Sequence, residues 1–177
     1  MATSMDKHID VSVHDSDHVE ELQSGTGAGV FLGVDIGGTY TKIGLVKKDG
    51  NSMAMSAFPT QADRSFSEFV KNLEQEVNSE LLSKYPDFML KGIGIGAPNA
   101  NYWNGRIEEA SNLSWGTVDV VSELEKKFDV PVIITNDANA AAMGEKYFGA
   151  AKEMENFILL TLGTGLGSGI MLNKSII

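Results

Sequence analysis

The sequence contains no cysteine, and none of its apolar runs approaches the roughly 20 residues that a membrane-spanning helix needs. The lack of cysteine excludes disulfides, thiol catalysis and cysteine-based zinc sites within this stretch. Basic residues are scarce as well: 14 Lys and Arg stand against 24 Asp and Glu, for a formal net charge of −10. A chain of that sign lacks the electrostatic footprint for a phosphate backbone, so we expect no nucleic-acid partner. Because no apolar run is long enough to span a membrane, we expect no membrane partner either. The N-terminus shows no basic-then-apolar signal pattern, and the sequence therefore predicts a cytoplasmic protein.

Residues 1–29 are polar and acidic, with six carboxylates against one base, Lys7. This composition predicts a disordered leader or a weakly docked arm. All three histidines lie in it. His14 and His18 could share one face of a helix and bind a metal, but histidines among solvated acids are usually polar filler, which is the interpretation we favour.

From Val30 onward, apolar runs alternate with glycine turns and helical patterns. Three apolar segments joined by tight turns predict an antiparallel β-meander (30–37, 40–46 and 52–58). A helix is expected after Ser65, which has Glu68 three residues on in the capping-box arrangement, and it should end before Pro86. The remaining predicted elements are a strand at 90–96, an irregular loop at 97–118, a helix at 119–128, a strand at 130–135, a helix at 137–148 and strands at 156–162 and 169–172. This order predicts an α/β fold with a mixed sheet, in which a β-meander is followed by helix–strand units.

An internal repeat is visible at an offset of 126 residues. Residues 31–39 align with residues 157–165, and each segment is an apolar strand that leads into a glycine turn and a second strand. We therefore expect a first lobe at 30–150, followed at 151–177 by only the first hairpin of a second, truncated lobe.

The first glycine turn is the sequence Asp-Ile-Gly-Gly-Thr that begins at Asp35. Two adjacent glycines, Gly37 and Gly38, expose backbone N–H groups that can wrap phosphate oxygens. The Thr39 hydroxyl and the Lys42 charge would add to this cradle. Because a carboxylate beside phosphates would repel them, Asp35 implies a Mg²⁺ ion held through water. The alternative is a type I′ hairpin in which the glycines merely supply positive φ.

The second glycine turn, residues 163–169, has four alternating glycines between apolar strands. Such glycines cost conformational entropy and are hard to justify unless a ligand approaches the backbone closely. Two such turns could grip a triphosphate from both sides. The candidate phosphate contacts in this turn are Gly163, Thr164, Gly165 and Gly167.

Asp137 lies just past a predicted strand, at the start of a helix. One interpretation is a helix N-cap, a position that aspartate fills well. The other is a general base that accepts a hydroxyl proton as that oxygen attacks phosphorus. The helix N-terminus would favour the ionised carboxylate that a base requires.

Polar and aromatic residues around the predicted strand ends suit a sugar. Asn112 and Asn136 offer both donors and acceptors for hydroxyl groups. Trp103 and Trp115, in the long loop, could stack on a sugar ring or simply anchor the loop.

Five motifs in a fixed order resemble the ROK family of bacterial glucokinases and related sugar kinases. They are Asp-Ile-Gly-Gly-Thr (35–39), Gly-Ile-Gly-Ala-Pro (94–98), Asn-Leu-x-Trp (112–115), Asn-Asp-Ala-Asn-Ala-Ala (136–141) and Leu-Gly-Thr-Gly-Leu-Gly-Ser-Gly (162–169). The resemblance implies the actin-like, ribonuclease-H-like ATPase fold and ATP-dependent phosphorylation of a hexose, with glucose as the expected substrate. It also allows a homodimer of the full-length protein.

The resemblance assigns roles to the candidate residues. Asp137 would be the catalytic base on the sugar 6-hydroxyl, and Asn112 and Asn136 would hold sugar hydroxyls. The two glycine turns would hold the phosphates of ATP, with Asp35 organising Mg²⁺.

The sequence departs from the family pattern at Asn99, where the family usually has glycine, and at Tyr40, where glucokinases often have asparagine. The family's Gly-Glu-x-Gly-His segment, its zinc motif and its adenosine-binding glycines would all follow Ile177. Two alternatives stay open. One is a sugar-responsive repressor of the same family, which would carry a helix-turn-helix before the kinase-like body. The other is a non-catalytic, truncated sugar-binding protein.

Overall fold

The computed structural model describes residues 28–162 and 165–177, which fall into two units. The larger unit spans Gly25–Asp137, and the other includes Ala138–Ile177. The three histidines, and the metal interpretation attached to two of them, lie outside the described residues. No helix in the described ranges is long and apolar enough to cross a membrane.

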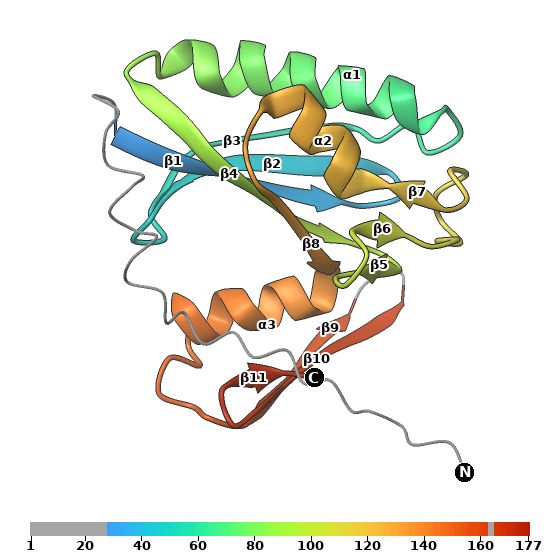
Figure 1. The fold of residues 1–177 in the computed structure, drawn as a ribbon. Helices are drawn as coiled ribbons and strands as arrows, with labels where there is room; N and C mark the ends of the chain where they lie inside the picture. Colours follow the sequence, from blue (N-terminus) through green and yellow to red (C-terminus); the bar gives the residue numbers. More distant parts are fainter. Residues whose placement is uncertain (1–27, 163–164) are drawn as a thin grey trace. The chain divides into compact units, whose positions relative to one another are not determined.

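A mixed sheet with the strand order β3-β2-β1-β4-β8 forms the centre of the larger unit (Figure 1). Strands β1, β2 and β3 make the predicted antiparallel meander, and β4 and β8 extend the sheet in parallel from β1. The carboxyl ends of β1, β4 and β8 therefore lie at one edge of the sheet. The strands are β1 (Ala28–Ile36), β2 (Tyr40–Lys47), β3 (Ser52–Pro59), β4 (Phe88–Ala97) and β8 (Val132–Asn136).

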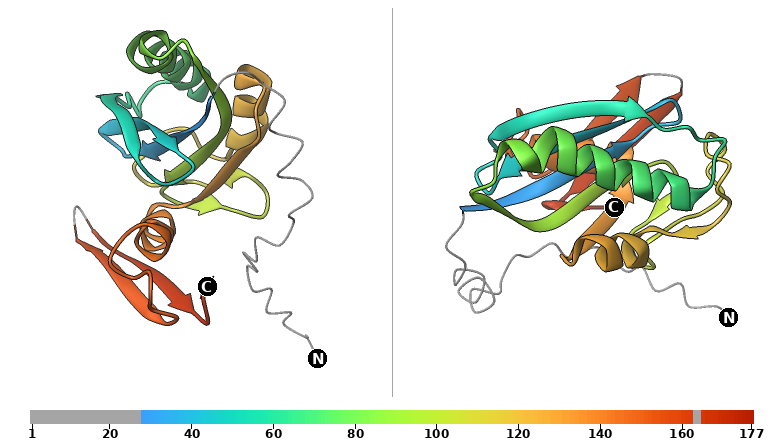
Figure 2. Two further views of the ribbon diagram at one scale, coloured as in Figure 1. Left: turned by 90° about the vertical axis from the view of Figure 1, so that its left-hand side faces the viewer. Right: turned by 90° about the horizontal axis from the view of Figure 1, so that it is seen from above.

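Two helices cover one face of this sheet, as Figure 2 shows. Helix α1 (Phe66–Glu76) begins with the predicted capping box, in which Ser65 and Glu68 exchange side-chain and backbone hydrogen bonds. It continues through a π-helical turn and a 3₁₀ turn to Lys84. Helix α2 (Val120–Phe128) is capped by Asp119, whose carboxylate accepts the Ser122 N–H at 3.1 Å. Both helices fall where the sequence predicts them.

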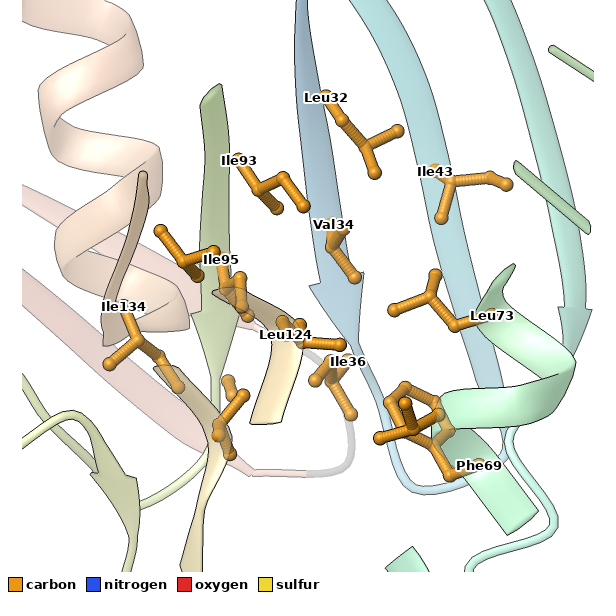
Figure 3. Close-up of a cluster of buried hydrophobic side chains, with 14 of the residues drawn as sticks. Leu32, Val34, Ile36, Ile43, Phe69, Leu73, Ile93, Ile95, Leu124 and Ile134 are labelled. Atoms are coloured by element: carbon orange, nitrogen blue, oxygen red, sulfur yellow. The ribbon is translucent and has the colours of Figure 1, made fainter. Parts of the chain in front are cut away.

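The core lies between the sheet and these helices (Figure 3). On β1 the alternate residues Val30, Leu32, Val34 and Ile36 are buried, because side chains alternate between the two faces of a strand. They meet side chains of α1 and α2, among them Phe69, Leu73 and Leu124. The intervening position Asp35 is exposed and belongs to the opposite face.

The sheet has two irregularities in its pairing. Between β1 and β4 the register shifts at Val30/Phe31, where Lys91 is left without a partner. Between β2 and β3 it shifts at Leu45/Val46, where Met53 is left out. Both extra residues lie at the end of the sheet remote from Asp35.

The long loop at 97–118, predicted as irregular, contains a small antiparallel sheet of three two-residue strands. These strands are too short to produce an alternating pattern that the sequence could reveal. Asn99 begins the loop with a left-handed φ of 49°. That conformation is natural for glycine and tolerated by asparagine, which accounts for Asn99 at a position where the family usually has glycine. The strands are β5 (Ala100–Asn101), β6 (Arg106–Ile107) and β7 (Val118–Asp119).

The second unit contains helix α3 and an antiparallel sheet in the order β11-β10-β9. Ala142 of α3 is buried with Met171 and Ile176 in a small core of its own. Strand β9 and strand β10 form the hairpin that the internal repeat predicts. The elements are α3 (Asp137–Tyr147), β9 (Phe157–Leu162), β10 (Leu166–Leu172) and β11 (Ser175–Ile176).

Candidate functional site

The edge of the larger sheet where the parallel strands end carries most of the predicted site residues. Asp35 of β1 pairs with Gly96 of β4, which pairs in turn with Thr135 of β8. Asn136 ends β8, and Asp137 follows at once as the first residue of α3. In open α/β sheets, ligands bind outside the carboxyl ends of the strands. This edge is therefore the candidate site of the larger unit.

The first glycine turn joins β1 to β2 at this edge. Neither Gly37 nor Gly38 has φ in the left-handed region, so the alternative in which they only supply positive φ is wrong. Gly37 is required for a steric reason: a Cβ there would lie 2.8 Å from the Tyr40 carbonyl oxygen, which accepts the Gly37 N–H at 3.1 Å. No hydrogen bond within the described ranges engages the N–H groups of Gly38 and Thr39. Those two N–H groups are free to meet a ligand.

Gly38 lies against the loop that carries Asn112. A Cβ on Gly38 would stand 3.1 Å from both the Cβ and the Nδ2 atoms of Asn112. Asn112 itself is exposed, whereas Leu113 and Trp115 just after it are buried in the main core. The structure thus brings a predicted phosphate contact and a predicted sugar contact together, 74 positions apart in the sequence.

The two tryptophans of the long loop have different surroundings. The Trp115 ring packs against Phe69 and Phe66, with ring centroids 4.7 and 5.3 Å away. Trp115 is therefore a loop anchor, one of the two interpretations that the sequence left open. Trp103 is 61% exposed and forms an edge-to-face pair with Tyr102, far along the loop from Asn112.

Asp35 and Lys42 are register partners on β1 and β2, and both are exposed. Paired residues of antiparallel strands project to the same face of the sheet, so the carboxylate and the ammonium group share the face opposite α1 and α2. No group of three or more metal-ligating side chains occurs within residues 28–162 and 165–177. A lone carboxylate nevertheless fits Mg²⁺, which usually keeps several waters and takes its other ligands from substrate phosphates.

Two threonines at this site were missed by sequence reasoning. The Thr60 hydroxyl, just after β3, donates to the Gly37 carbonyl oxygen at 2.7 Å, and the Thr60 N–H donates to the Thr39 carbonyl oxygen at 2.9 Å. Thr41 lies 2.9 Å from Thr60, hydroxyl to hydroxyl. No sequence motif marks these residues. The only signal in the sequence is a threonine at a strand end, and its contact with the turn is visible only in the structure.

Packing within the second unit explains one glycine of the second glycine turn. A Cβ on Gly169 would collide with the Ala138 carbonyl oxygen and would lie 2.6 Å from the Ala142 Cβ. A Cβ on Gly167 would meet the Thr161 hydroxyl and the Ala138 Cβ. The expectation that these glycines require a ligand is therefore wrong for Gly169, because the packing of α3 on β10 already requires a glycine there. Gly167 stays a predicted phosphate contact, since the nearest neighbour of a Cβ there is the Thr161 side chain of β9. Gly163 and Thr164 lie outside the described residues, and Gly165 is exposed.

We expect Gly169→Ala to lower the free energy of unfolding by about 1–3 kcal/mol, the usual cost of overpacking. The added methyl group has no space, since both neighbours belong to α3 and one of them is backbone. Urea unfolding followed by circular dichroism would measure the change. Gly165→Ala is the matched control: a Cβ there meets nothing within 4 Å, and its effect should stay below about 0.5 kcal/mol. Equal stability of the two variants would contradict the packing explanation.

Known proteins resemble this chain over most of its length. It is 34% identical over 149 residues to the glucokinase of Halalkalibacterium halodurans. This match covers 83% of this chain and 45% of that protein. It is 33% identical over 149 residues to the xylose repressor of Bacillus spizizenii, covering 83% of this chain and 38% of that protein. The crystal structure of a ROK family glucokinase from Streptomyces griseus, in complex with glucose and AMPPNP, superposes with a TM-score of 0.75 at 31% identity, over 84% of this chain and 46% of that one.

The chain therefore spans less than half the length of each of these relatives. Its larger unit has the mixed sheet of a meander followed by helix–strand units. The similar solved structures include ROK sugar kinases, which have the actin-like ATPase fold, so the predicted fold class is confirmed. The model of the ROK family matches residues 31–177. This chain belongs to the ROK family.

Proposed function

We propose that the protein carrying this chain transfers the γ-phosphoryl group of ATP to a hexose, with glucose as the substrate and glucose 6-phosphate as the product. The observation that supports this most is the contact between the first glycine turn and Asn112 at the carboxyl edge of the sheet. It puts free backbone N–H groups suited to phosphate beside an exposed amide suited to a sugar hydroxyl. A phosphoryl-transfer site needs both in one place.

In the proposed reaction the first glycine turn holds ATP phosphates through the Gly38 and Thr39 N–H groups, and Lys42 adds positive charge. Asn112 and Asn136 hold sugar hydroxyls. The Asp137 carboxylate accepts the proton of the 6-hydroxyl as that oxygen attacks the γ-phosphorus.

Mg²⁺ bound with ATP would neutralise the charge that develops on the phosphate oxygens. Asp35 is the residue that would hold it, through water, at the end of β1. Lys42 on the same face would balance the Asp35 charge when no nucleotide is present.

A repressor role is the second candidate, and the match to a xylose repressor over 83% of this chain favours it. Such a protein would use the same face of the sheet to sense a sugar. Electrophoretic mobility shift with promoter DNA, with and without xylose, separates the two functions, since a kinase leaves the DNA unshifted.

The proposed function is tested by titration calorimetry and a product assay. Glucose and Mg-AMPPNP should each bind, and incubation with glucose and MgATP should yield glucose 6-phosphate, detectable by ³¹P nuclear magnetic resonance. The assay is run on this chain and on any longer product of its gene. The matched ligand 6-deoxyglucose should bind without yielding product, because it lacks the acceptor hydroxyl. Absence of both binding and product in every preparation would refute the proposal.

A further inference from the structure

Thr41 and Thr60 are the two polar residues that are fully buried in the described part of the chain, with 0% and 1% of their surfaces exposed. A buried hydroxyl is costly unless it is hydrogen-bonded, and an apolar residue of the same shape would avoid the cost. Both hydroxyls lie directly behind the first glycine turn and bond to each other at 2.9 Å. Packing alone therefore does not explain why hydroxyl groups occupy these two buried positions.

The direction of the hydrogen bonds follows from counting protons. A threonine hydroxyl has one proton, and Thr60 donates it to the Gly37 carbonyl oxygen at 2.7 Å. The Thr41 hydroxyl must therefore be the donor to Thr60. The result is a chain of bonds from Thr41 through Thr60 to the backbone of the turn, in which each bond polarises the next.

This chain of bonds fixes one peptide group of the turn. In a trans peptide, the carbonyl oxygen and the N–H of the next residue point in opposite directions. Because Thr60 holds the Gly37 carbonyl oxygen toward the protein interior, the Gly38 N–H is held pointing away from it. The Gly38 N–H is one of the two free N–H groups of the turn.

The segment after Thr60 also reaches the asparagine loop, residues 112–115. The Ser114 N–H donates to the Ala62 carbonyl oxygen at 2.9 Å. Asn112, two residues before Ser114, is the residue that Gly38 touches. One short connector between β3 and α1 is thus bonded to the glycine turn at one end and to the asparagine loop two residues later.

We propose that Thr60 is a positioning residue, whose hydroxyl orients the Gly37–Gly38 peptide so that the Gly38 N–H faces a phosphate. The connector between β3 and α1, which begins at Thr60, holds the glycine turn and the asparagine loop next to each other. The assignment of the phosphate rests on the proposed function. The orientation of the peptide does not, and it can be measured without any ligand.

The test compares Thr60→Val, which removes the hydroxyl at constant shape, with Thr60→Ser, which retains it. Hydrogen exchange by nuclear magnetic resonance reports on the Gly37 and Ser114 amides, which are bonded to Tyr40 and Ala62. The Ile93 amide, bonded to Pro131 at the middle of the sheet, is the reference. In Thr60→Val we expect exchange at Gly37 and Ser114 to rise about tenfold, the effect of losing one hydrogen bond, with Ile93 within about twofold of wild type.

Nucleotide affinity supplies the second readout. The Kd for Mg-AMPPNP should rise about tenfold in Thr60→Val and return to within about twofold of wild type in Thr60→Ser. Thr41→Val is the matched control, since it removes a neighbouring buried hydroxyl but leaves the bond from Thr60 to Gly37 in place. Its effect on Gly37 exchange should be clearly smaller than that of Thr60→Val.

Several results would overturn the proposal: unchanged Gly37 exchange in Thr60→Val, an equal rise at Ile93, a serine variant that behaves like valine, or a Thr60→Val chain that fails to fold. The last two would make Thr60 an ordinary core residue. If the wild-type chain binds no nucleotide and forms no product, the proposed function fails, while the exchange data still decide whether Thr60 orients the turn.

Discussion

Asp137→Asn should lower the rate of sugar phosphorylation by about 10²–10⁴-fold, the range expected when a general base is removed. Asparagine has nearly the same shape as aspartate but cannot accept a proton at neutral pH. The 6-hydroxyl would then have to lose its proton to water while its oxygen attacks phosphorus. Because the substrate contacts assigned to Asn112, Asn136 and the glycine turn remain, we expect the Kd values for glucose and Mg-AMPPNP to change by less than about threefold.

Asp119→Asn is the matched control for this variant. Asp119 is also an aspartate at a strand–helix junction: it ends β7, and its carboxylate caps α2 by accepting the Ser122 N–H. Asparagine caps helices about as well as aspartate, so this variant should retain full turnover. Steady-state kinetics of both variants, with melting temperatures as the check on folding, make the comparison. Near-normal turnover in Asp137→Asn would remove Asp137 from the role of base and leave it a helix-start residue.

Gly37→Ala is expected to have the second-largest effect, a rise of about 10- to 100-fold in the Kd for Mg-AMPPNP. The added Cβ would lie 2.8 Å from the Tyr40 carbonyl oxygen, a backbone atom that cannot rotate away. The turn must open, which breaks the hydrogen bond between the Gly37 N–H and that oxygen and displaces the Gly38 N–H. Relief of such a contact costs about 1–3 kcal/mol, which corresponds to the stated change in affinity.

The same substitution at Gly94 provides the control. Gly94 lies in β4 of the same sheet, but a Cβ there meets nothing within 4 Å and its φ is not left-handed. We expect Gly94→Ala to leave the nucleotide Kd within about twofold of wild type. Calorimetric titration of both variants measures the difference. If Gly37→Ala binds as tightly as Gly94→Ala, the turn does not hold the nucleotide.

The sequence predicted the elements of the larger unit because their signals are local. The apolar runs and tight turns of the meander, the Ser65–Glu68 capping box and the stop before Pro86 each depend on residues close together in the sequence. The site residues at strand ends followed from the same patterns, since a strand followed by a helix places the junction at a sheet edge.

What the sequence could not predict depends on contacts between distant segments. Thr41 and Thr60 are 19 positions apart, and only the pairing of β2 with β3 brings their hydroxyls together. The sequence favours a ligand as the reason for Gly169, because nothing in it says that α3 packs on β10 at that position. In both cases the sequence shows the residue type but not the residue that it contacts in the folded protein.

The two extra residues of the sheet, Lys91 and Met53, bear on how such a protein can change length during evolution. Each stands where its strand already departs from regular pairing, at the end remote from Asp35. From there to the candidate site the pairing is continuous: Asp35 meets Gly96, and Tyr40 meets Pro59. A one-residue deletion at either bulge would shorten the strand without turning any later side chain to the other face. Insertions and deletions among homologues should therefore collect at that end, while the strand segments that lead to the site keep a constant length.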